Sequence, residues 1–330
     1  MYPHVMVIIG EADKAQVSEV SVGAILNFAG LYLYGRADFV QAEPLYRRAL
    51  KIWEEQLGGD HPYVAASLNN LASLLKDQGK YADAEPLYRR VLKIREEQLG
   101  GSHPDVAASL NNLANLLEVQ GKYTEAEPLY RRALKIWEEQ VGGDHPDVAP
   151  ILNNLAMLLE AQGKYADAEP LYRRALKIRE EQLGGSHPDV AAGLNNLANL
   201  LKDQGKYAEA EPLYRRALKI CEDQLGDDHP YVATSLNNLA NLVEAQGKYA
   251  EAEPLCRRAL KIREEQLGGD HPSVATSLNN LAALLKSQGK YAEAEPLYRL
   301  ALNILEKKLG KGHPNTVTVR KNLALLKNSK

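Results

Sequence analysis

Histidines followed by proline recur along the chain every 42 residues, and imidazoles can bind metals or transfer protons. A zinc site needs ligands that converge on one ion at about 2.0–2.3 Å. No cluster of Cys, Asp or His at ligand spacing accompanies these histidines. We therefore predict that they serve helix starts and that the chain holds no metal. The histidines are His61, His103, His145, His187, His229, His271 and His313.

A Gly-Lys pair in the recurring text QGKY is a second candidate, because a glycine-rich loop that ends in Gly-Lys can cradle phosphate. The phosphate loop also needs an upstream glycine and a following Ser or Thr, and both are missing here. We interpret QGKY as a turn between two helices and expect no nucleotide cofactor.

Paired arginines could indicate a surface for nucleic acid. In each copy a glutamate lies four residues before the first arginine, and opposite charges at this spacing form ion pairs on a helix. The arginine pairs are Arg89-Arg90, Arg131-Arg132 and Arg173-Arg174, and the glutamates are Glu85, Glu127 and Glu169. We therefore expect a salt-bridged helix surface and no nucleic-acid partner.

Pairs of asparagines recur in the middle of an apolar helical segment. Asparagine is a poor helix former, because its side chain competes for backbone groups, so twelve of them in mid-helix require an explanation. One hypothesis is that the second asparagine of each pair faces a groove, where its amide suits the backbone of an extended ligand. The alternative is that one asparagine bonds across a helix interface and fixes the stacking. The second asparagines are Asn70, Asn112, Asn154, Asn196, Asn238 and Asn280.

Two further positions on the same helical side change from copy to copy, and specificity for a ligand would reside there. The first lies three residues after the second asparagine and is Asn115, Asn199 and Asn241 in three copies. The second lies one turn further and is Lys76, Lys202 and Lys286 in three copies and glutamate in three others. We predict that these residues line the groove and select a partner of mixed charge. Neutral drift of a solvated face is the alternative.

One position of the second helix also varies, and we assign it no role. Its residues are Trp53, Arg95, Trp137, Arg179, Cys221, Arg263 and Leu305.

The elements that must position these residues follow from the 42-residue period. A fixed period of 20 to 50 residues indicates a repeat array. We predict seven tandem repeats over residues 18–312 and a capping helix over residues 313–330. The repeats are 18–60, 61–102, 103–144, 145–186, 187–228, 229–270 and 271–312. Residues 1–17 match no part of the repeat, and we treat them as a leader.

Each repeat is predicted to form two helices. In one copy, apolar residues recur at helical spacing over residues 106–117, and Gly121 then supplies the C-cap. The second helix is expected to begin near Tyr123 and to end at Gly142. Ser102, directly before His-Pro, is the predicted N-cap.

The composition suits a helical array, with 45% apolar and 25% charged residues. A net charge of −3 argues against a chain held to nucleic acid by charge. No apolar stretch approaches the roughly 20 residues of a membrane span, and the first residues lack the features of a signal peptide. Cys221 and Cys256 are isolated substitutions, so we expect no disulfide, a reducing compartment and the cytoplasm.

The unit resembles the tetratricopeptide repeat, a helix–turn–helix unit usually of 34 residues. The residues that carry the likeness in one copy are Leu110, Leu113, Ala114, Leu117, Gly121, Tyr123, Ala126, Tyr130 and Ala133. The length of 42 residues and the text LNNLA…QGKY.EAEPLYRRAL.I further resemble the repeats of kinesin light chains and their bacterial relatives. The resemblance covers residues 18–330.

This resemblance implies an all-α, right-handed superhelix whose concave surface, lined mainly by first helices, binds an extended peptide or a partner helix. It also implies that an asparagine on the first helix, with nearby Lys or Arg, holds peptide backbone or acidic groups, and the second asparagine of each pair matches it. The chain has no N-terminal heptad coiled coil such as kinesin light chains use to join their heavy chain, so we expect no motor role.

We therefore predict a non-catalytic scaffold that binds a protein or peptide along its concave groove, with no cofactor, nucleic acid or membrane as partner. One alternative is the sensor or assembly region of a larger multidomain signalling protein. Another is an enzyme, although no unique cluster of nucleophile, base or metal ligand is present. The last alternative is that the chain is a near-consensus repeat array selected mainly for stability.

Overall fold

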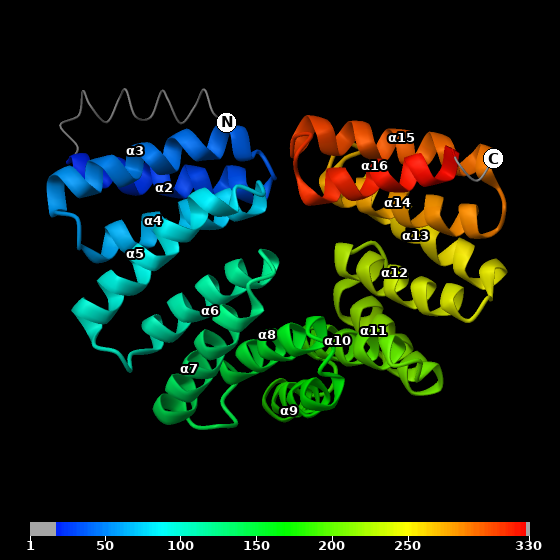
Figure 1. The fold of residues 1–330 in the computed structure, drawn as a ribbon, viewed down its shortest axis with the longest axis horizontal. Coiled ribbons are helices and arrows are strands. Elements are labelled where there is room, and N and C mark those ends of the chain that lie inside the picture. Colours follow the sequence, from blue (N-terminus) through cyan, green and yellow to red (C-terminus); the bar gives the residue numbers. More distant parts are fainter. Residues whose placement is uncertain (1–17, 328–330) are drawn as a thin grey trace. The chain divides into compact units, whose positions relative to one another are not determined.

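The computed structural model describes residues 18–327, and these form helices joined by short turns (Figure 1). First and second helices alternate, and each first helix from α2 to α14 packs against the second helix that follows it. The first helices are α2 (Glu19–Gly35), α4 (Pro62–Asp77), α6 (Pro104–Val119), α8 (Val148–Ala161), α10 (Pro188–Asp203), α12 (Pro230–Ala245), α14 (Pro272–Ser287) and α16 (Pro314–Lys327). The second helices are α3 (Phe39–Leu57), α5 (Tyr81–Leu99), α7 (Tyr123–Val141), α9 (Tyr165–Leu183), α11 (Tyr207–Leu225), α13 (Tyr249–Leu267) and α15 (Tyr291–Lys308).

This arrangement confirms the predicted all-α fold of seven helix pairs and a final capping helix, α16. The predicted leader, residues 1–17, lies outside the described residues.

A histidine caps the first helix in most repeats. In α4, α6, α10, α12 and α14 its Nδ1 accepts a hydrogen bond from the backbone N–H two residues later. His103, for example, accepts from the N–H of Asp105 at 3.1 Å. The proline between them occupies the first turn, where a missing N–H costs nothing. The prediction that Ser102 is the N-cap is therefore wrong by one residue, because the imidazole supplies the acceptor that Ser or Asp usually provides.

Glycines end both helices of a repeat by adopting positive φ angles. Gly121 has φ +75° after α6, and Gly142 has φ +91° after α7. Side chains disfavour this conformation, and glycine does not. Beyond Gly121 the chain turns back so that the N–H of Lys122 reaches the carbonyl of Leu117 at 2.8 Å, which closes the helix end.

The core of a repeat combines small and large side chains. Ala114, Ala126 and Ala133 are fully buried, so the helix axes can approach closely. Leu110 and Tyr130 fill the space beside them and are also fully buried. Each second helix contacts its own first helix and, within each compact unit, the first helix of the next repeat. Stability therefore comes both from packing within a repeat and from packing between neighbouring repeats.

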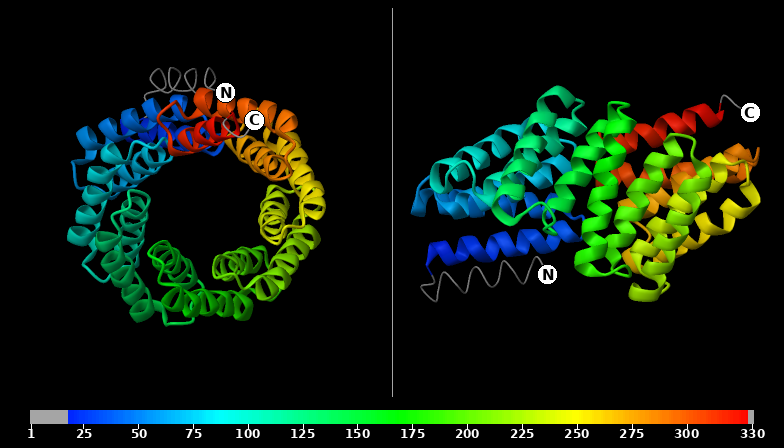
Figure 2. Two further views of the ribbon diagram at one scale, coloured as in Figure 1. Left: turned by 45° about the vertical axis from the view of Figure 1, so that its right-hand side comes forward. Right: turned by 90° about the horizontal axis from the view of Figure 1, so that it is seen from below.

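The helices form two compact units, one that ends at Gly142 and one that begins at Gly143. In the second unit, neighbouring first helices from α8 to α16 contact one another. Neighbouring second helices have no comparable contact among residues 143–327. This unit therefore curves with its first helices on the inner side (Figure 2).

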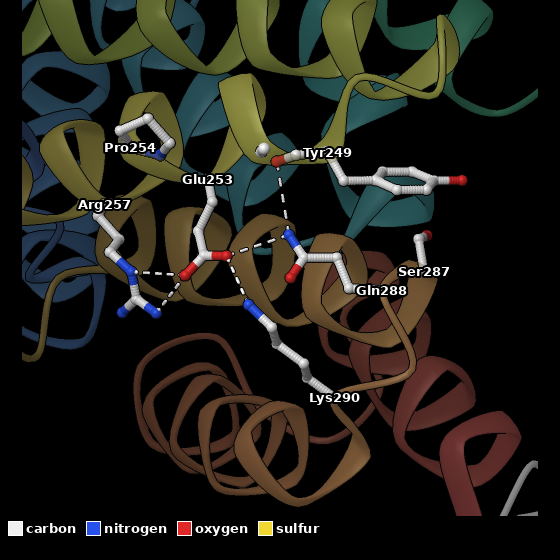
Figure 3. Close-up of a pocket in the computed structure, with 8 residues that line it drawn as sticks. Tyr249, Glu253, Pro254, Arg257, Ser287, Gln288 and Lys290 are labelled. Atoms are coloured by element: carbon white, nitrogen blue, oxygen red, sulfur yellow. Dashed lines mark hydrogen bonds and ion pairs between the residues drawn. The ribbon is translucent and has the colours of Figure 1, made fainter.

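A recurring glutamate joins successive repeats through ion pairs, and Figure 3 shows one example. Glu253 on α13 binds Arg257 at 2.7 Å and Lys290, which precedes α15, at 2.9 Å. Gln288 donates a third hydrogen bond to the carboxylate at 3.1 Å. The bonds from Lys290 and Arg257 lower the pKa of Glu253 from 4.5 to about 2, although partial burial opposes this. We call this arrangement the glutamate clamp.

The clamp recurs in other copies, as with Glu85, Arg89 and Lys122. The prediction that the arginine pairs form a salt-bridged helix surface with the glutamates four residues earlier is confirmed.

Candidate functional site

The asparagine pairs lie between neighbouring first helices, and they adopt two arrangements. We call the contact between two neighbouring first helices a seam. In a closed seam, the second asparagine donates from Nδ2 to Oδ1 of the first asparagine in the preceding repeat. The closed seams are Asn70 with Asn27 at 3.0 Å, Asn112 with Asn69 at 2.9 Å, and Asn322 with Asn279 at 2.9 Å. These amides connect repeats, which is the stacking role that the sequence left open as the alternative.

Three seams of the second unit are open, because the first asparagine turns away from its partner. Asn195 and Asn237 donate to the hydroxyls of Ser235 and Ser277 at 3.2 Å. Asn153 donates to the carbonyl of Ala149 at 3.0 Å. The Oδ1 atoms of these three asparagines are buried without a hydrogen-bond partner.

The second asparagines of the open seams are Asn196, Asn238 and Asn280, on α10, α12 and α14. Each is half-buried, and its side-chain amide forms no hydrogen bond with any residue from 18 to 327. Asn154 on α8 is also half-buried but is not free. The six predicted groove asparagines therefore fall into two classes, and only three of them offer unused amides.

The open seams leave hydrogen-bonding capacity unused. A buried carbonyl oxygen without a partner costs about 1–3 kcal/mol. The closed seams satisfy the same residue types in the same chain, so the asparagine pair itself does not require the open arrangement. A ligand that bonds to the free amides would gain more on α10, α12 and α14 than on α4 and α6.

The predicted specificity residues are also half-buried on the first helices. Lys76 donates from Nζ to Oδ1 of Asn115 at 3.5 Å, so two of them meet across α4 and α6. Lys202 forms an ion pair at 3.3 Å with the aspartate that follows it. The side chains of Asn241 and Lys286 form no hydrogen bond or ion pair with the described part of the chain.

Tyrosine hydroxyls from the second helices form hydrogen bonds with residues at the two variable positions of the first helices. This role was not predicted from the sequence. Tyr214 donates to Oδ1 of Asn199, and Tyr130 donates to the carboxylate of Glu118 at 2.8 Å. Burial raises the pKa of Glu118, although the tyrosine hydrogen bond opposes this. The available signal was the recurrence of a tyrosine at this place in every repeat from 18 to 312 except the one that carries Cys256.

The variable residue of the second helix also has a place in the structure, because it packs against the next repeat. Arg95 donates from Nη1 to Ser109 Oγ at 2.9 Å and to the carbonyl of Asp105 at 3.0 Å. Arg263 repeats this pattern with Ser277 Oγ at 2.9 Å. A guanidinium thus fills the seam between two repeats and is held by neutral acceptors.

Trp53 fills the same seam with an indole. Its Nε1 donates to the carbonyl of Val20 at 3.0 Å, and its ring centroid lies 5.4 Å from that of Tyr63. A Cβ at Gly23 would lie 2.5 Å from Nε1, so the glycine makes room for the ring.

Cys221 stands at this position beside α10 and α12, and a cavity of 260 Å³ lies next to it. Its thiol is 3.7 Å from Ser235 Oγ. The lining residues include Pro188, Ala192, Asn195, Asn196, Tyr231 and Asn238. The cavity therefore adjoins an open seam, and one part of the second unit combines a hollow with free amides.

Other kinds of site have less support in the structure. No three His, Cys, Asp or Glu side chains among residues 18–327 are placed to hold a metal ion. Cys221 and Cys256 are free and buried, and burial raises the pKa of both thiols, which leaves them protonated and unreactive at neutral pH. No helix in the described range is long and apolar enough to cross a bilayer.

Comparison with known protein families gives matches along nearly all of the array. A family model described as tetratricopeptide repeat matches residues 21–97, 63–118, 105–181, 189–265, 237–307 and 274–329. A second model with the same description matches residues 153–224. No curated protein matches the sequence.

Solved structures with similar folds include kinesin light chain-like proteins. A putative kinesin light chain of Podosopora anserina with nearly identical TPR-like repeats is 27% identical, with a TM-score of 0.52 over 62% of this chain and 97% of that one. BtubC (BKLC) of P. vanneervenii is also 27% identical, with a TM-score of 0.54 over 72% of this chain and 93% of its own. Yeast Tom70 shares the fold at 16% identity, with a TM-score of 0.64 over 98% of this chain and 58% of Tom70.

Proposed function

The chain belongs to the tetratricopeptide repeat family, and from this premise we propose that it is an interaction scaffold that binds an extended peptide along α10, α12 and α14. Arrays of this family are generally non-catalytic scaffolds for protein partners. The observation that carries the proposal is the row of free, half-buried amides at Asn196, Asn238 and Asn280.

The chemistry of these amides suits a peptide backbone. Each asparagine offers two N–H donors and a carbonyl acceptor, and an extended backbone presents the complementary groups along its length. The three amides recur once per repeat on neighbouring helices at the inner side of the second unit. A ligand that follows this side would meet them in succession.

The charges on the same helices suggest the composition of the ligand. Lys202, Glu244 and Lys286 alternate along α10, α12 and α14, and all three are half-buried. A segment that carries both acidic and basic side chains would complement them, because like charges opposed at an interface are unfavourable. We therefore expect a partner of mixed charge and not a purely acidic tail.

The proposal is tested by replacing the free amides and the bonded amides separately. Peptides selected from a displayed library on the whole chain are titrated into the wild type and into a variant with Asn196→Ala, Asn238→Ala and Asn280→Ala. Loss of three hydrogen bonds should weaken binding by at least about tenfold.

The matched control carries Asn70→Ala and Asn112→Ala, which remove closed-seam hydrogen bonds in the first unit. It should lose stability and keep its affinity for the selected peptide. If the folded triple variant binds the peptide as tightly as the wild type, or if both variants weaken binding equally, the groove is not at the open seams.

A further inference from the structure

We propose that the cavity beside Cys221 binds a flat aromatic ring that carries an N–H or O–H donor on its edge. The ring would come from a side chain of a groove-bound peptide or from a free small molecule. The peptide source rests on the function proposed above, and the small-molecule source does not.

The inference begins with two first helices of almost the same sequence. Residues 61–72 read HPYVAASLNNLA and residues 229–240 read HPYVATSLNNLA, so they differ at one position. The second helix before each presents a different residue to this segment, Trp53 in the first case and Cys221 in the second. The chain thus contains nearly the same first-helix start beside a tryptophan and beside a cysteine.

The two positions that Trp53 contacts can be matched with residues of the cavity. Trp53 bonds to the carbonyl of Val20 and lies against the ring of Tyr63. Four repeats later the residues at these positions are Pro188 and Tyr231, and both line the cavity. Because Cys221 stands where Trp53 stands in the first unit, no indole from this position covers the ring of Tyr231. The cavity is therefore lined by the residues at the two positions that Trp53 contacts in the first unit.

The volume of the cavity suits one small ring system. An apolar cavity of about 150 Å³ can hold benzene, and sites for drug-sized ligands span about 300–1,000 Å³. At 260 Å³ the cavity lies between these sizes. A bicyclic ring such as indole, or a phenol, is therefore the expected occupant.

The residues that line the cavity favour a bound ring that carries a hydrogen-bond donor. Asn195 lines the cavity and is 8% exposed, and its buried Oδ1 has no hydrogen-bond partner. Because this oxygen is closed off from solvent, the amide of Asn195 would have to turn to present it to an N–H or O–H at the ring edge, as the carbonyl of Val20 accepts from the indole Nε1–H of Trp53. A purely apolar guest would leave the acceptor unsatisfied, which is costly in a buried site.

The surrounding charges favour a neutral ring over a cation. Arg179 donates to the carbonyl of Asp189 at 3.4 Å, and Arg263 donates to Thr234 Oγ1 at 3.1 Å. Asp189 and Thr234 both line the cavity, so a guanidinium lies behind each. The two guanidiniums offset the carboxylate of Asp189, which also lines the cavity, and the face of an aromatic ring attracts cations.

One difference between the two seams limits how deeply the guest enters. Gly23 admits the indole of Trp53, whereas the matching residue beside the cavity is Ala191. The methyl group of Ala191 occupies the space that Gly23 leaves open. The guest ring therefore lies nearer to Tyr231 and to the open seam than Trp53 lies in its own repeat.

Titration of the whole chain with indole, followed by NMR of the backbone amides, tests the site. In the wild type we expect one saturable site, with the largest shifts at Tyr231 and Thr234. Cys221→Trp combined with Ala191→Gly, which opens the space that Gly23 leaves for Trp53, fills the cavity from within and should weaken binding at least tenfold. Cys221→Arg should do the same and has a precedent in Arg95, which bonds to the matching serine. Retention of the same shifts in either folded variant would overturn the proposal.

A reciprocal variant and a peptide pair complete the test. Trp53→Cys should create a second indole site, marked by shifts at Tyr63, and Tyr231→Ser should weaken the original site. A groove-binding peptide with a central tryptophan should lose affinity when that residue becomes alanine, and only in chains that keep Cys221. If indole binds and no peptide does, the ring site stands and the proposed function fails. If a peptide binds through the open-seam asparagines while indole does not bind at the cavity, the ring site is wrong and the proposed function stands.

Discussion

Asn112 and Asn238 occupy the same position of the repeat, yet only Asn112 bonds to the neighbouring repeat. The amide of Asn112 completes the acceptor of Asn69 at 2.9 Å. The amide of Asn238 faces no partner from the described chain, while the acceptor of Asn195 across the seam stays unsatisfied. The two asparagines therefore differ in what they contribute to stability and in what they offer to a ligand.

Asn112→Ala should destabilise the chain by about 1 kcal/mol, because it removes one hydrogen bond and leaves Asn69 without its donor. Asn238→Ala should be neutral or stabilising by up to about 0.7 kcal/mol, because alanine is the better helix former. Urea unfolding followed by circular dichroism measures both. Equal destabilisation by the two changes would contradict the distinction between closed and open seams.

The histidine caps give a second prediction for single residues. His271 accepts from the N–H of Ser273 at 3.1 Å, which requires a neutral Nδ1. Burial lowers the pKa of His271 below its usual 6.5, and the charges of Lys308 and Arg263 add to this. A lowered pKa in the folded state means that the cap is fully present above pH 6.5 and is lost as pH falls below that value.

We expect His271→Ala to cost about 1 kcal/mol at pH 7.5 and progressively less at lower pH. His271→Asn keeps a side-chain acceptor that does not titrate, so its stability relative to the wild type should rise as pH falls to 5. Chemical unfolding at both pH values provides the comparison. A pH-independent difference between wild type and His271→Asn would show that the imidazole does not act as a titrating cap.

At the scale of helices, the glutamate clamps connect repeats by charge. Glu253 has a side chain only 20% exposed and receives bonds from Arg257, Lys290 and Gln288. Its pKa of about 2 is lower than the usual 4.5, so the folded state favours the carboxylate. The stabilisation is present above pH 4.5 and is lost as pH falls from 4.5 towards 2.

Glu253→Gln should therefore reduce the free energy of unfolding by about 1 kcal/mol at pH 7, a value kept modest because solvent screens partly exposed pairs. The difference from the wild type should vanish as pH approaches 2. Glu265 serves as the control, since it is 52% exposed and lies 3.8 Å from Lys261. Glu265→Gln should have almost no effect at any pH, and a loss equal to that of Glu253→Gln would argue against the clamp.

The seams between helices show where sequence reasoning reaches its limit. The helices, the glycine turns and the buried Leu and Ala positions follow from periodicity and local chemistry, because each depends on residues close in sequence. The contact of Arg95 with Ser109 depends on two helices that meet only after folding. Reading position 95 together with position 109 does not reveal the pairing within one sequence, because Arg179 is matched by Gly193, and Ser67 and Ser235 are matched by Trp53 and Cys221.

The division of the asparagines could not be predicted for a different reason. The same Asn-Asn letters occur in six repeats, so no local pattern distinguishes Asn112 from Asn238. Their hydrogen bonds depend on how neighbouring first helices approach, which many side chains of the seam determine together. The sequence identified the candidate position, and only the packing of repeats separates the bonded amides from the free ones.

At the scale of the whole molecule, the constant period predicts that one repeat can be removed cleanly. Deletion of residues 187–228 joins Ser186 to His229, which restores the same junction text. After the deletion, Arg179 and Ser235 have the same separation in sequence as Arg95 and Ser109, which form a hydrogen bond. The shortened chain should stay folded, and its denaturant m-value should fall by about an eighth, in line with the surface lost.

This variant also lacks Cys221, so it should bind no indole at the position of the cavity. Circular dichroism per residue, the m-value and the indole titration check the three expectations together. A large loss of helicity per residue would mean that the repeats of the second unit are not interchangeable.

The histidine cap has a consequence for the gene as well as for the protein. Each cap uses an imidazole and a backbone N–H two residues later. The residues that start a repeat are therefore contained within that repeat. Recombination between any two His-Pro codons therefore adds or removes a complete structural unit in frame. A single recombination event could then change the number of repeats. It could also replace the repeat that carries Cys221 with one that carries Trp or Arg at this position.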